Sequence, residues 1–228
     1  MRLIISQPFG KLLSFGLLLS FVMLLSLPLH AATQPNEDQL RQELKQAETN
    51  KGMPNQTEVV QALQSALSWL ADAKESDIRA QQYQKAIDDF PKLTRELRQE
   101  LAQEGDKPLP VPSNMSTSEL EQQVLQISSQ LLELSRLSQQ EQDRAREISE
   151  SLSQLPQQQS EARRILAEIS TRLQAQSNPA NPVSQAQFAL LQAEAVARKA
   201  KANELELSQL SANNRQELSR LRAELYKK

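Results

Sequence analysis

Side chains capable of covalent or acid–base chemistry are scarce in this chain. It contains no Cys, and its single His is His30. A thiolate nucleophile, a disulfide and a Cys-ligated zinc are therefore excluded. Because one imidazole at the end of an export segment (below) cannot serve a triad or a His-ligated metal, those sites drop out as well. The sequence predicts a protein that is not an enzyme and that uses no cofactor and no metal.

Charged residues also fail to form a convincing site. A carboxylate cluster at 141–150 is interleaved with Arg144 and Arg146. On a helix such neighbours form ion pairs along the surface rather than a concave acid–base or metal site. The basic pairs at 163–164 and 199–201 are flanked by Glu, and the net charge is only −2. We expect no nucleic-acid partner and no small-molecule substrate. The carboxylates of the cluster are Glu141, Asp143, Glu147 and Glu150.

Composition points to helices that must pack without large aromatic cores. Hydrophobic residues make up 39%, aromatic residues 4% and charged residues 24% of the 228 residues. Leu, Ala, Gln and Glu dominate, which is typical of long helices and coiled coils. No run alternates β-branched and polar residues as a strand would. The predicted fold class is all-α.

The first 31 residues have the pattern of a secretory signal peptide. Arg2 and Lys11 precede an apolar run at 12–27, and Pro28 breaks that run before small residues at Ala31 and Ala32. The apolar core is shorter than the roughly 20 residues that a membrane span needs. We therefore expect cleavage after Ala31 or Ala32 rather than an uncleaved anchor, and a periplasmic location. Nothing after Ala32 is apolar enough to span a bilayer.

Residues 32–105 predict a small N-terminal bundle of three short helices. The first runs from Glu37 to about Glu48, and the turn at 52–55 precedes a second helix that begins near Thr57. Pro91 lacks a backbone donor, so the second helix is expected to stop or kink at Phe90. A third helix would then end at Gly105. Trp69 lies at the edge of the apolar stripe and is expected to complete a helical core. A helical hairpin repeat is the alternative arrangement.

A Pro-rich linker at 106–115 separates this bundle from a predicted coiled-coil hairpin at 116–228. Ser116 and Glu119 form a capping-box pattern. Pro156 is expected to kink the first long helix rather than end it, and the polar loop at 177–182 connects it to an antiparallel partner. Ser184 is a candidate cap of the second helix. The chain ends in mid-pattern, and we expect a longer helical sequence to have been cut there.

The strongest pattern is an apolar seam on the first long helix. Its positions recur at alternating steps of four and three for about five heptads, which is the spacing of a coiled coil. Ser138 and Glu141 interrupt the seam and either weaken it or make a local polar contact. The spacing leaves open whether the seam packs within the chain or between chains. The predicted packing and interface residues are Leu120, Val124, Ile127, Leu131, Leu134, Ala145, Ile148, Leu152 and Leu155.

Six segments stand in order along the chain: EVVQALQSAL at 58–67, FPKL at 90–93, QISSQLL at 126–132, RAREI at 144–148, LPQQQ at 155–159 and LSANNRQEL at 210–218. This ordered series resembles the N-terminal periplasmic region of large mechanosensitive channels of the small-conductance (MscS) family. The resemblance is to the miniconductance and potassium-dependent types, and it is closest to the miniconductance type.

The resemblance implies a periplasmic coiled-coil domain of a channel that protects Gram-negative cells against hypoosmotic shock. The pore would lie in a membrane part that this chain lacks, so the membrane is reached only through that missing C-terminal part. The implied partners are other copies of the chain or the remaining parts of a channel subunit. A free-standing periplasmic adaptor or scaffold protein is the alternative.

Overall fold

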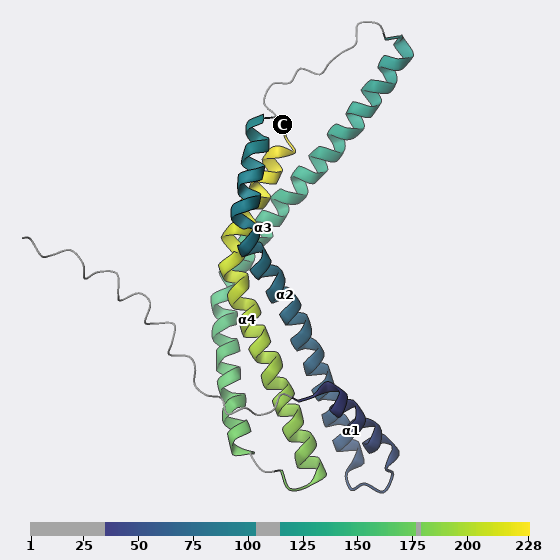
Figure 1. The fold of residues 1–228 in the computed structure, drawn as a ribbon, viewed down its shortest axis with the longest axis vertical. Coiled ribbons are helices and arrows are strands. Elements are labelled where there is room, and N and C mark those ends of the chain that lie inside the picture. The colour runs from purple at the N-terminus through teal and green to yellow at the C-terminus, as the bar shows by residue number, and fades with distance from the viewer. Residues whose placement is uncertain (1–34, 104–114, 177–178) are drawn as a thin grey trace, which may run out of the picture. The chain divides into compact units, whose positions relative to one another are not determined.

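The computed structural model describes residues 35–103, 115–176 and 179–228. These residues form four α-helices: α1 (Glu37–Thr49), α2 (Gln56–Gln103), α3 (Thr117–Ala175) and α4 (Pro182–Leu225) (Figure 1). No strand occurs in those three ranges. The all-α prediction is therefore confirmed. The expected signal peptide at 1–31 lies outside the described residues.

Helix α1 folds back onto the start of α2. The side chain of Asn36 accepts a hydrogen bond from the backbone of Asp38 and caps α1. At the other end, the side-chain amide of Gln56 donates to the carbonyl of Ala47 at 2.6 Å. It thereby satisfies one of the free carbonyls that every helix C-terminus leaves. Leu40 is buried in the resulting core.

Helix α2 does not end at Pro91, so the prediction of a third short helix was wrong. The helix continues to Gln103 with Pro91 exposed inside it. Contacts with α4 hold α2 on both sides of the proline: Tyr83 packs under Arg215, and Arg98 pairs with Glu217 at 3.2 Å. This tertiary packing offsets the cost of about 3 kcal/mol that proline imposes on a helix interior.

Helix α4 packs against both other long helices. Contacts along its length show that α2 and α4 run in parallel, since Glu58 bonds to Gln187 near their starts and Arg98 pairs with Glu217 near their ends. Helix α3 runs antiparallel to α4, as the predicted hairpin requires. In the part of the chain that the structure describes, α2 and α3 make no packing contact with each other.

From the sequence we expected an N-terminal bundle and a coiled-coil hairpin, each with its own core, on either side of a linker. The described helices are arranged differently. Residues Pro35–Lys228 form one compact unit, in which α2 is covered by α4 rather than by a third short helix. The physical reason is that α2 alone offers a long apolar stripe, which the short α1 covers only at its start. The expected linker at 106–115 lies outside the described residues except for Met115, so its role as a boundary stays a prediction.

Small residues form much of the contact between α2 and α4. Ala66 and Ala193 are fully buried in one cluster, and Ala73 packs with Ala197 and Ala200 in the next. Side chains of this size let two helix backbones approach closely, so that many atoms reach van der Waals distance. Packing of this kind depends on fit rather than on large apolar area.

The ends of the long helices are formed by local side chains. The capping box at Ser116 is confirmed: its hydroxyl accepts from the backbone of Glu119, whose carboxylate accepts from the backbone of Ser116. The N-cap of α4 is Asn181 rather than the predicted Ser184. Ser184 is the third residue of the helix, and its side chain and backbone form the reciprocal hydrogen bonds of a capping box with Asn181. Pro182 is the first residue of the helix. The helix passes through Pro156 without ending, as predicted.

Enlarging a buried alanine should destabilise this interface. We expect Ala66→Leu to lower the free energy of unfolding by about 1–3 kcal/mol, because the added atoms have no space between α2 and α4. Ala71→Leu, on the exposed side of the same helix, is the matched control and should change stability by less than about 0.5 kcal/mol. Urea unfolding followed by circular dichroism measures both, and equal effects of the two variants would contradict the packing described.

Candidate functional site

The predicted seam on α3 divides into two parts with different surroundings. From Ser138 onward it faces α4. The hydroxyl of Ser138 donates to the carbonyl of Ala223 at 3.0 Å, and Gln216 donates to the carbonyl of Ala145 at 3.4 Å. Further along, Leu155 is buried against Leu205. Of the predicted seam residues, this part contains Ala145, Ile148 and Leu155, which are buried, and Leu152, which is half-buried.

The first part of the seam is not covered by any described residue. Figure 1 shows that α3 leaves the side of α4 toward its N-terminal end. Leu131 exposes 68% of its surface, and Ile127 is only half-buried. The structure therefore does not bring the two halves of the seam into one interface. The exposed seam residues are Leu120, Val124, Leu131 and Leu134.

The two polar interruptions of the seam make local polar contacts, which was one of the two predicted outcomes. Ser138 is buried and bonds to α4 as described above. Glu141 is also buried, and one of its oxygens accepts from Arg144 at 2.9 Å. Glu141 was predicted to form an ion pair on the helix surface. The pair with Arg144 is present, but the carboxylate is buried because Glu141 lies on the seam face rather than on the outer face of α3.

Some of the remaining charged residues of α3 form ion pairs on the surface, as predicted. Asp143 lies 3.6 Å from Arg146, and Glu161 lies 2.7 Å from Arg164. Among the residues that the structure describes, no group of three or more His, Cys, Asp or Glu side chains is arranged to hold a metal ion. These positions contribute to a solvated helix surface.

An ionic cluster between α2 and α4 is the main polar feature that sequence reasoning missed. The Glu204 side chain is 7% exposed and accepts hydrogen bonds from Arg79 at 3.2 Å and from Lys201 at 2.8 Å. Burial raises the pKa of the Glu204 carboxyl, and hydrogen bonds from the two cations lower it by more, so the pKa lies below its ordinary value. The sequence feature that could have indicated this cluster is the spacing of Lys201 and Glu204, which lie about one helical turn apart.

Two arginines of α4 stack on aromatic rings of α2. The guanidinium of Arg198 lies 4.6 Å from the centroid of Trp69, and that of Arg215 lies 4.5 Å from the centroid of Tyr83. Burial lowers the pKa of Arg215. Such contacts contribute electrostatic attraction and also cover apolar ring surface. Trp69 packs against the α2–α4 core, as its place at the edge of the stripe predicted.

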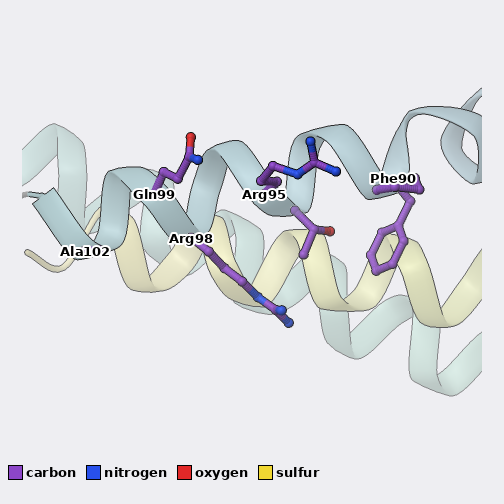
Figure 2. A pocket seen from close by; sticks show the side chains of 7 residues that line it. Phe90, Arg95, Arg98, Gln99 and Ala102 are labelled. Atoms are coloured by element: carbon purple, nitrogen blue, oxygen red, sulfur yellow. The ribbon is translucent and has the colours of Figure 1, made fainter.

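A shallow groove follows one face of α2 around Pro91. Figure 2 shows that Phe90 and Arg98 point toward α4, whereas Arg95 and Gln99 point away from it. The hydroxyl of Thr94 is buried here and makes no hydrogen bond to another described residue. The groove brings together no acid, base or nucleophile, so its geometry supports no chemical step. It is a surface feature next to the α2–α4 contact.

The fold and its contacts thus define a helical packing domain, and comparison with known proteins identifies its family. Residues 43–228 match the family described as "Mechanosensitive ion channel porin domain". The chain belongs to this family.

One curated relative is the miniconductance mechanosensitive channel MscM of Escherichia coli (strain K12). It is 52% identical over 199 residues, which cover 87% of this chain and 18% of that protein. The chain therefore spans less than a fifth of the relative's length. No solved structure matches the chain. In the described ranges of this chain, every helix is too short or too polar to cross a membrane.

Removing the buried carboxylate should weaken the α2–α4 contact and its response to acid. We expect Glu204→Gln to lower the free energy of unfolding at pH 7 by about 1–2 kcal/mol, because two charge-assisted hydrogen bonds are lost. A carboxyl group whose pKa is lowered by folding stabilises the folded protein when the pH lies above the pKa of that group in the unfolded chain. This stabilisation is lost as the pH falls through the pKa of the folded state. The wild-type protein should therefore lose stability below about pH 4.5 more steeply than the variant.

Unfolding free energies measured between pH 3 and pH 7 test this expectation. Glu206→Gln, which replaces an exposed carboxylate on the same helix, is the matched control and should leave both stability and pH dependence close to wild type. An unchanged stability and acid response in Glu204→Gln would show that the cluster contributes nothing to folding.

Proposed function

We propose that this chain is the periplasmic coiled-coil domain of a mechanosensitive ion channel subunit. In this proposal the pore lies in another part of a longer polypeptide. The channel would open when membrane tension rises and protect the cell against hypoosmotic shock. The identity of 52% over 199 residues to a miniconductance mechanosensitive channel is the observation that carries the proposal.

The proposed role of the domain is mechanical rather than catalytic. Its described helices are held together by close packing of α4 against α2 and α3, and by polar contacts such as that between Arg79 and Glu204. A domain of this kind can hold neighbouring segments at a fixed spacing without binding a substrate. The partners are other copies of the chain or the remaining parts of the subunit.

The proposed periplasmic location rests on the sequence of the first 31 residues. Arg2 and Lys11 followed by an apolar run at 12–27 match a secretory signal, with cleavage after Ala31 or Ala32. This segment lies outside the described residues, so its support comes from the sequence pattern. Attachment to the inner membrane would come through the channel part of the subunit.

Exchange of the matched segments tests the function. We expect E. coli MscM whose matched segment is replaced by that of this chain to give tension-activated currents in membrane patches, because half of the side chains are identical. The same exchange carrying Ala66→Leu is the control for a damaged domain and should reduce the amount of channel or its currents. A hybrid that reaches the membrane in normal amount but passes no current under tension would contradict the proposal and favour a free-standing scaffold.

A further inference from the structure

Helix α2 is packed unevenly along its length. Of the nine buried side chains that the structure describes on α2, eight lie between Val59 and Ala80, and the ninth is Thr94. We call residues 57–80 the packed part of α2 and residues 92–103 its terminal part. The leucines of the terminal part are half-buried rather than buried: Leu93, Leu97 and Leu101. The terminal part is therefore held to α4 by fewer buried contacts than the packed part.

Pro91 weakens the backbone of α2 at the point where the terminal part begins. Proline has no N–H, so the carbonyl of Ile87, four residues earlier, loses its regular helical donor. The proline ring also crowds the preceding turn, and sharp bends of long helices occur at such positions. Helix α2 is bent rather than straight (Figure 1). The two parts of the helix are thus joined by an interrupted hydrogen-bond ladder.

The side chain of Thr94 makes contact of the terminal part with α4 less favourable. Thr94 is 8% exposed, and its hydroxyl has no hydrogen-bond partner among the described residues. It lies two heptads after Ala80, on the face that α4 covers in the packed part. A buried hydroxyl without a partner bears the cost of its lost water, and this cost disappears when the group is hydrated again.

The ion pair that links the terminal part to α4 is exposed. Arg98 points toward α4 (Figure 2) and lies 3.2 Å from Glu217, but the two side chains are 64% and 36% exposed. Exposed pairs of this kind are screened by water and contribute little to stability. In the packed part, by contrast, Arg79 meets the carboxylate of Glu204, which is 7% exposed. The polar contacts therefore hold the packed part more firmly than the terminal part.

We propose that Pro91 is a hinge in α2, about which residues 92–103 detach from α4 and return while residues 57–80 stay packed. The interrupted backbone supplies the joint, and hydration of the Thr94 hydroxyl offsets part of the contacts that are lost. Such a hinge lets the C-terminal end of α2 change direction without opening the close contacts of Ala66 and Ala73 with α4. This inference does not depend on the channel function proposed above.

Hydrogen–deuterium exchange of the whole chain, resolved to single amides, tests the hinge. A detached helix of twelve residues is marginal in water, so its amides exchange when it leaves α4. We expect amides 92–98 to share one level of protection, about tenfold or more below that of amides 73–80, with a step at Pro91. Fraying of a helix end would instead give protection that declines gradually toward Gln103.

Two substitutions identify the parts of the hinge. Pro91→Ala restores a donor for the Ile87 carbonyl at an exposed position and should slow the exchange of amides 92–98 by about tenfold or more. Thr94→Val keeps the shape of the side chain, removes the unpaired hydroxyl and should slow the same amides by about tenfold. Thr57→Val, at an exposed position near the start of α2, is the matched control and should leave their exchange unchanged.

Three results would overturn the proposal. In the wild type, amides 92–98 could be protected as strongly as amides 73–80. The step at Pro91 could persist unchanged in Pro91→Ala. Exchange in Thr94→Val could equal that of the wild type. The tension-activated currents of the hybrid channel test the proposed function separately from each of these results.

Discussion

The close approach of α4 to two neighbours is the constraint on which the described structure depends. Helix α4 packs on α2 along one side and on α3 along another, whereas α2 and α3 do not contact each other in the described ranges. Small side chains such as Ala193, Ser211 and Ala212 are fully buried on it. Because alanine and serine bury little area each, stability comes from the number of close contacts, and a single added side-chain branch disturbs them.

Close packing also explains why several polar groups of the interface are paired. A carboxylate or hydroxyl that loses water between helices costs free energy unless it finds a partner. Glu204 meets Arg79 across the α2–α4 contact, and Ser138 meets the carbonyl of Ala223 across the α3–α4 contact. Directional contacts of this kind fix the helices in one register, which apolar contacts alone specify less strictly. The two arginines of α4 that stack on aromatic rings of α2 also help to fix the register of these two helices.

Sequence patterns predicted the helices well and their partners less well. The α1 helix, the capping box at Ser116 and the continuity of α3 through Pro156 follow from local rules, and the structure agrees. The continuity of α2 through Pro91 could not be predicted, because contacts with α4 decide it. On α4, the hydrophobicity of a residue does not indicate its burial, since Leu210 is 62% exposed and Ser211 is fully buried. Periodicity showed that α3 has an apolar face along its length, but it cannot show which segment covers that face.

Hydrogen–deuterium exchange of the dilute protein tests the central role of α4 most directly. Amides between about residues 190 and 223 should exchange most slowly, because opening them requires separation from two helices. Amides of residues 117–137 of α3 should exchange faster than those of the part of α3 that faces α4. Faster exchange in α4 than in α2 and α3 would contradict this account.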